Sequence, residues 1–147
     1  MIDHFTLKVS DVPKSKPFYA ASLKPLGYVV AMEFGTSCGL GVAGKPDFWL
    51  TQDPDNVRPM HFAFHSTDRK AVDAFYAAAL ASGGRDNGPP GVRTDYHPSY
   101  YAAFVLDPDG HNVEVVCHAP QAAAKRKAAR ARPKPKAARR PAKRSRR

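Results

Sequence analysis

The sequence predicts an α+β fold built from two tandem copies of one βαβββ unit. An internal repeat is the first observation: shifted by 57 residues, the segment from His4 to Gly27 matches the later segment at nine of 24 positions. The second is the order of the matches, which is His-Phe, then Asp, an aromatic pair, Leu and Gly in both copies. Similarity at a fixed spacing indicates a duplicated supersecondary unit.

Each copy is expected to begin with a strand and a helix. Residues 5–9 and 61–65 alternate in a period of two, which is typical of half-buried strands. Asp11 and Asp68 follow these segments and can cap the helices that come next. Glycines near positions 27 and 84 suit the helix ends.

Three more strands are expected in each copy. In the first copy they are residues 28–34, 39–43 and 48–51, and in the second 93–97, 101–106 and 113–117. The turn Asp107–Gly110 contains the Pro and Gly that suit a tight reversal. The modules therefore span about residues 1–53 and 58–118, and we expect them to form a cupped mixed sheet.

Charge divides the chain into two segments. The 147 residues carry a net charge of +10, yet residues 1–120 hold ten basic and all 13 acidic residues, a net charge of −3. Residues 121–147 hold 13 basic residues and no acidic one. We predict one folded domain over residues 1–120, followed by a disordered tail rich in Lys, Arg, Ala and Pro.

The composition also favours some locations and partners over others. No apolar run reaches the roughly 20 residues of a membrane span, and two cysteines, Cys38 and Cys117, do not make a disulfide framework. We therefore expect a cytoplasmic protein with no membrane partner. The basic tail would bind nucleic acid through the phosphates without reading bases, which would associate the protein with the nucleoid. The alternative is a solvated extension with no partner.

Two histidines and one glutamate are candidate metal ligands. His4 and His61 occupy equivalent positions in the two copies, and Glu114 lies in the middle of an apolar strand. A carboxylate that faces a core is costly unless it is paired or binds a metal. Two imidazoles and one carboxylate leave coordination positions open and suit Fe, Mn, Zn or Ni. The alternative for each His alone is a hydrogen-bonded residue at a strand end.

A resemblance to the vicinal oxygen chelate superfamily rests on three segments, IDHFTLKVSD, HFAFHSTD and DPDGHNVEVV. This superfamily includes glyoxalase I, extradiol dioxygenases, fosfomycin-resistance thiol transferases and bleomycin-binding proteins. The resemblance covers residues 1 to about 118 and implies a metal ion held in a cup by His4, His61 and Glu114. It also implies a homodimer, in which module one of one chain pairs with module two of the other and each site is shared.

Departures from the family pattern bear on the reaction. Glyoxalase I has a fourth ligand, a Glu, where this chain has Trp49, which cannot bind a metal; Asp47, two residues earlier on the same face, is the remaining substitute. Fosfomycin thiol transferases agree with this chain at Thr6 and Trp49. They resemble it less at Phe104, where they have a Tyr that contacts substrate.

Extradiol dioxygenases need an acid or base near the metal, and the segment 96–101 offers His97 and Tyr100. Counting from Phe104, Tyr100 is expected on the strand face that lines the cup. The alternatives are sheet packing for Tyr100 and surface hydrogen bonding for His97. Arg93 is predicted to be a solvated strand residue, with the binding of a substrate carboxylate as its alternative.

These observations predict a divalent-metal-dependent, glyoxalase-like enzyme of the lyase, isomerase or dioxygenase type, acting on a small oxygenated substrate chelated to the metal. Glu114 would be both a ligand and the catalytic base. The residues expected to contact the substrate are Thr6, Trp49, His97, Tyr100 and Phe104. The alternatives are a non-catalytic small-molecule binding or resistance protein, and a fosfomycin-type thiol transferase.

Overall fold

The computed structural model describes residues 2–120 and contains two βαβββ modules. The first consists of β1 (Phe5–Val9), α1 (Val12–Ser22), β2 (Val29–Phe34), β3 (Ser37–Val42) and β4 (Lys45–Gln52). The second consists of β5 (His61–Ser66), α2 (Arg69–Ala81), β6 (Arg85–Val92), β7 (Tyr101–Leu106) and β8 (Asn112–Cys117). Short 3-10 helices, η1 (Lys24–Leu26) and η2 (Pro54–Asn56), follow α1 and β4. The predicted α+β fold of two tandem modules is confirmed; the predicted disordered tail, residues 121–147, lies outside the described residues.

Each module forms its own four-stranded mixed sheet, in the orders β1-β4-β3-β2 and β5-β8-β7-β6. The first and last strands of a module run parallel, and the other neighbours are antiparallel. Parallel neighbours need a long connection, which the helix and the two intervening strands provide. The arrangement places β5, which begins with His61, directly beside β8, which carries Glu114.

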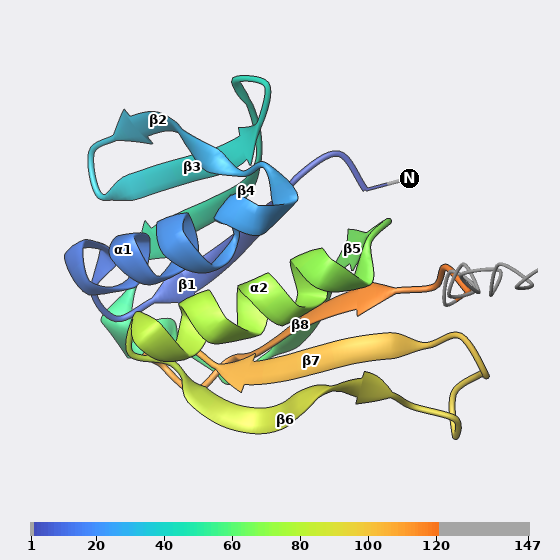
Figure 1. Ribbon diagram of the computed structural model, residues 1–147. Coiled ribbons are helices and arrows are strands. Elements are labelled where there is room, and N and C mark those ends of the chain that lie inside the picture. The colour runs from blue at the N-terminus through green and yellow to red at the C-terminus, as the bar shows by residue number, and fades with distance from the viewer. Residues whose placement is uncertain (1, 121–147) are drawn as a thin grey trace, which may run out of the picture.

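The helices lie side by side between the two sheets (Figure 1). The helix-facing sides of the sheets also meet, because Phe48 of β4 packs against Phe64 of β5 with ring centroids 5.3 Å apart. Phe5 and Phe62 meet in the same way at 5.5 Å. The other face of each sheet therefore points away from its neighbour, and the two sheets do not join into one cup within this chain.

Both helices begin at the aspartates that the sequence predicts as caps. Asp11 accepts a hydrogen bond from the backbone N–H of Lys14, and Asp68 accepts one from that of Lys70. Both aspartates thus satisfy backbone donors that have no partner inside the helix. No helix among residues 2–120 is long and apolar enough to cross a membrane.

The first strand after α2 is a correction to the sequence prediction. We expected residues 93–97, whereas the structure has β6 at Arg85–Val92, and residues 94–96 form a turn. β6 contains Gly88 and two prolines, which argue against a strand when the sequence is considered alone. It is an edge strand with shifts in its register to β7, so it tolerates residues that lack a ladder donor.

The turn between β7 and β8 is organised around Asp107, which is almost fully buried. Its carboxylate accepts hydrogen bonds from the backbone N–H groups of Asp109 (2.9 Å) and His111 (2.8 Å). It also accepts one from the hydroxyl of Tyr19 on α1, at 2.7 Å. A buried carboxylate is stabilised when several donors converge on it.

Two other side chains of this turn also reach the first module. Asp109 accepts hydrogen bonds from the backbone N–H of Ser10 (2.9 Å) and from its hydroxyl. His111 donates from Nε2 to the carbonyl of Lys8 (3.1 Å) and accepts from the N–H of Met60 at Nδ1 (3.2 Å). The turn therefore ties the second module to β1 and α1 of the first.

We expect Tyr19→Phe to lower the free energy of unfolding by about 1–3 kcal/mol, because it leaves a buried carboxylate oxygen of Asp107 without its donor. Urea unfolding would measure the loss. Tyr96→Phe is the control, since Tyr96 is exposed. Equal stability of the Tyr19 and Tyr96 variants would contradict a role for this contact.

The same contact has a pH signature. Burial, followed by the charge of Asp107, raises the pKa of Tyr19 well above its ordinary value. The folded state thus holds this proton more tightly than the unfolded chain, so the contribution is complete below about pH 10 and is lost as pH rises further. Above about pH 10 the stability of the wild type should fall more steeply than that of Tyr19→Phe.

Candidate functional site

A buried carboxylate and an exposed imidazole meet on the outward face of the second module. Glu114 is 2% exposed, and its Oε2 lies 2.9 Å from Nε2 of His61, whose side chain is 53% exposed. Parallel pairing of β5 and β8 brings them together, with Ala63 opposite Glu114. The pair presents one nitrogen and one oxygen donor, both of types that bind divalent metals.

Two aromatic residues of the Tyr100 to Leu106 region cover Glu114. The hydroxyl of Tyr100 donates to Oε1 of Glu114 at 2.5 Å. Burial, together with the hydrogen bond and charge of Glu114, raises the pKa of Tyr100 to about 12. Phe104 lies directly opposite Glu114 in the β7–β8 pairing, with its ring 6.0 Å from that of His61. Tyr100 keeps its proton at neutral pH and holds the carboxylate in place.

Two histidines continue this face beyond Tyr100. Nε2 of His97 lies 2.8 Å from Nδ1 of His118, and both rings pack against Tyr100. Because Nδ1 of His97 accepts from the backbone N–H of Ser99, we assign the His97 proton to Nε2, from which it donates to His118. His118 is not among the site residues predicted from the sequence, although strand alternation places residues 114, 116 and 118 on one face.

The remaining predicted residues lie on the outward face of the first module. The side chain of His4 is 62% exposed and its Nδ1 lies 3.0 Å from a carboxylate oxygen of Asp3. Thr6 and Trp49 are partners in the β1–β4 pairing. Trp49 lies close against Gly39, where an added Cβ would come within 2.9 Å of the indole. These side chains therefore belong to the first module, whereas His61 and Glu114 belong to the sheet of the second.

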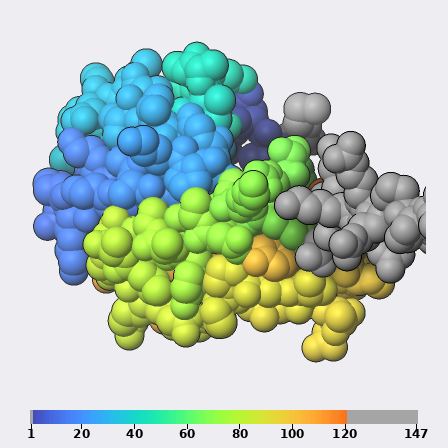
Figure 2. Space-filling model, in the orientation of Figure 1, coloured from blue at the N-terminus to red at the C-terminus, as the bar shows by residue number. Residues whose placement is uncertain are grey.

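The structure brings His61 and Glu114 together and leaves His4 apart from them. Among residues 2–120, the one group of three His, Cys, Asp or Glu donors within 4.8 Å of one another is Asp107, Asp109 and His111. His4 and His61 instead line one cavity of about 390 Å³ between the modules. Its opening is visible beside the N-terminal residues in Figure 2.

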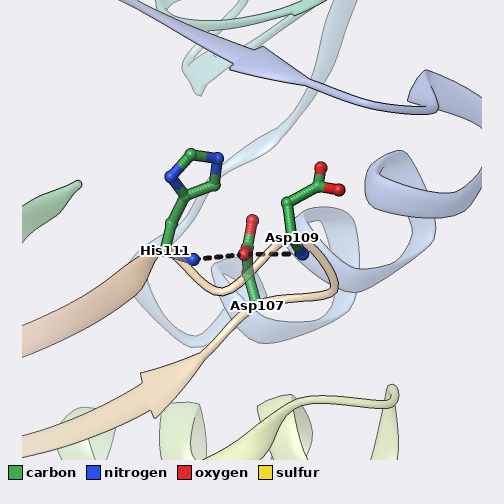
Figure 3. Close-up of side chains that lie close together, drawn as sticks. All are labelled: Asp107, Asp109 and His111. Atoms are coloured by element: carbon green, nitrogen blue, oxygen red, sulfur yellow. Dashed lines mark hydrogen bonds between the residues drawn. The ribbon is translucent and has the colours of Figure 1, made fainter. Parts of the chain in front are cut away.

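The cluster of Asp107, Asp109 and His111 has a spacing that a metal ion could bridge. Figure 3 shows the Asp107 carboxylate bound to the backbone of the other two residues. Its second oxygen, both oxygens of Asp109 and both ring nitrogens of His111 also have hydrogen-bond partners. The known partners account for every donor atom, so we assign this cluster to the structure of the turn.

Asp47 brings an acidic group to the cavity that His4 lines. Its Oδ1 is buried and has no hydrogen-bond partner among the described residues. Burial, followed by the charge of Asp47, raises the pKa of Tyr28 to about 12. A hydrogen bond between Tyr28 and Asp47 contributes to this shift, so the carboxylate has one partner and only its Oδ1 is left without one.

Two comparisons with known proteins identify the family of this chain. The family model of the glyoxalase/bleomycin resistance protein/dioxygenase superfamily matches residues 1–115. The uncharacterized protein YqjT of Bacillus subtilis (strain 168) is 30% identical in an alignment of 131 positions, which covers 77% of this chain and 95% of that protein. The chain therefore belongs to the glyoxalase/bleomycin resistance protein/dioxygenase superfamily.

Solved structures share the architecture. A glyoxalase/bleomycin resistance protein from Albidiferax ferrireducens T118 is 27% identical with a TM-score of 0.66, covering 78% of this chain and 95% of that one. A glyoxalase-related enzyme from Fulvimarina pelagi is 18% identical with a TM-score of 0.62, covering 80% and 87%. The second likeness shows the fold alone.

The contact between Tyr100 and Glu114 can be tested by titration. In Glu114→Gln the charge next to the phenol is removed, so the pKa of Tyr100 should fall from about 12 part of the way toward its ordinary value, since burial remains. NMR of chains labelled at the tyrosine ring carbon would measure it, with Tyr100→Phe to assign the signal. An unchanged pKa would show that Glu114 does not influence this phenol.

Proposed function

We propose that the protein is a divalent-metal-dependent enzyme that acts on a small oxygenated substrate, at a site shared between two chains. His61 and Glu114 of one subunit and His4 of the partner subunit would hold the metal. The observation that carries the proposal is the buried Glu114 carboxylate in contact with His61. A carboxylate in the middle of an apolar strand is costly without such a role.

The arrangement of the modules supports a shared site. The ligand-bearing faces of the two sheets point away from each other, and His4 is exposed on its own face. A second chain can place its first module against the second module of the first chain, which would complete two sites at once. Exposed apolar side chains on β2, among them Phe34 at 80%, give such a partner a surface to cover.

The residues of the outward face have distinct roles in this proposal. A bound divalent metal would supply Lewis-acid activation of a chelating oxygen. Tyr100 orients Glu114 through its hydroxyl, and the Glu114 carboxylate can take a proton from the substrate if it leaves the metal. Phe104 and Trp49 limit the space for the substrate, and Thr6 and His97 provide polar contacts.

Two alternatives remain distinct from this proposal. A non-catalytic binding protein would use the aromatic residues to hold a compound and would not need Glu114 to be buried in a strand. A fosfomycin-type thiol transferase would use the same donors, but Phe104 cannot supply the phenol that a Tyr supplies there. The metal and the substrate decide between a lyase, an isomerase and a dioxygenase.

A shared site makes a specific prediction for mixed dimers. His4→Ala and His61→Ala homodimers should each bind Zn²⁺ or Mn²⁺ more than about 100-fold more weakly than the wild type. Even the loss of a residue that only hydrogen-bonds to a metal ligand lowers metal affinity by roughly 10- to 100-fold. A heterodimer of the two variants should regain one tight site, because His4 of one chain and His61 of the other are intact. Metal titration of differently tagged, co-purified dimers would measure this.

His65→Ala is the matched control, since His65 lies on the same face of β5 and is not a proposed ligand. Wild-type affinity in the His61→Ala homodimer would refute the metal site. A heterodimer without a tight site would refute sharing between chains while leaving a metal site within one chain in place.

We propose separately that residues 121–147 bind nucleic acid. Charge segregation supports this: the tail holds 13 basic and no acidic residues, while residues 1–120 have a net charge of −3. Phosphate contacts release counterions and need no base recognition. The domain would then remain a metal enzyme that is tethered by its tail.

The tail makes a salt-dependence prediction. If it neutralises roughly eight phosphates, the logarithm of the DNA affinity should fall with the logarithm of salt concentration at a slope near −7. Fluorescence anisotropy with duplex DNA would compare the full chain with residues 1–120, whose binding should be lost. Equal binding by both chains would contradict the proposal.

A further inference from the structure

The second module carries a cation beside the proposed site. Arg93 follows β6, and its backbone N–H donates to the carbonyl of Tyr100 at 2.7 Å, which makes the two residues cross-strand neighbours. The guanidinium lies over the ring of Phe104, 5.5 Å from the centroid. Phe104 in turn faces Glu114 and the His61 ring. Arg93 therefore lies on the face of the sheet that carries His61 and Glu114.

The surrounding loop holds this guanidinium in place. Nη2 of Arg93 donates to the carbonyl of Pro89 at 2.6 Å. Two glycines leave room for it: an added Cβ would lie 3.3 Å from Nη2 at Gly88 and 3.4 Å from Nη1 at Gly91. Gly88 also has a φ of +149°, which side-chain-bearing residues rarely adopt. The loop thus fits around a cation already held against an aromatic ring.

The charge of Arg93 is not neutralised by the described residues. Ion pairs in residues 2–120 involve Lys8, Lys16, Lys45 and two histidines, and none involves Arg93. A guanidinium has five N–H donors, of which the Pro89 carbonyl takes one. The remaining N–H groups of the planar guanidinium have the geometry that binds a carboxylate through two parallel hydrogen bonds.

We propose that Arg93 binds a carboxylate of the substrate, at the end opposite to the metal-chelating oxygens. Two strand spacings, roughly 10 Å, separate β8 from β6, so one small molecule can reach from Glu114 to Arg93. The substrate class is therefore a chelating molecule with a remote carboxylate, bound across the Phe104 ring. This inference rests on the proposed metal site for the chelating end.

Three compounds that share one catechol chelating group test the inference: catechol, protocatechuate and the neutral amide of protocatechuate, of which the last two have nearly the same shape. They would be titrated calorimetrically into the full chain saturated with redox-inert Zn²⁺. Protocatechuate should bind roughly ten- to a hundredfold more tightly than the amide, which is the value of a charge-assisted hydrogen-bond pair. Arg93→Gln should abolish that preference without changing the affinity for the amide, and Arg93→Lys should restore part of it.

Arg85→Gln is the matched control, because Arg85 lies exposed at the other end of the same strand. It should keep the full preference for protocatechuate. Equal affinities of the wild type for the acid and the amide, or a preference that survives Arg93→Gln, would overturn the carboxylate site while leaving the metal site standing. Failure of all three compounds to bind the Zn²⁺-loaded protein would overturn both.

Discussion

The buried carboxylate of Asp107 determines how the two modules sit against each other. It has to be satisfied where water is excluded, and its donors come from its own turn and from Tyr19 of the first module, 88 residues away in the chain. Asp109 and His111 of the same turn bind the backbone next to and within β1. Because the turn begins β8, this junction also places the strand that carries Glu114.

Packing of the modules through their helices has a consequence for function. The helix-facing sides of both sheets are buried in one shared core, so only the other face of each sheet is available to ligands. His4 lies on the first module and the pair of His61 and Glu114 on the second, although His4 and His61 both line the cavity between the modules. In the proposed shared site the third ligand comes from a second chain, which would couple metal binding to association.

The outward face of the second module carries more interacting side chains than the proposed metal ligands alone. Glu114 is held by His61 and Tyr100, and Tyr100 packs between Tyr96 and two histidines. At the other end of this face Arg93 lies over Phe104. Under the proposed function, such a row of a carboxylate, a phenol, an aromatic ring and a cation would favour an elongated polar substrate over a simple apolar one.

The sequence by itself determined the duplicated βαβββ order, the helix caps at Asp11 and Asp68, and the face shared by Tyr100, Phe104 and Glu114. These features follow from local geometry, since strand alternation and helix capping depend on residues a few positions apart. It did not locate β6, because an edge strand tolerates Gly and Pro that would break a central one. Only the tertiary structure joined Tyr100 to Glu114, placed Arg93 over Phe104 and left His4 outside the contact between His61 and Glu114. Such contacts depend on how sheets and loops pack rather than on local periodicity.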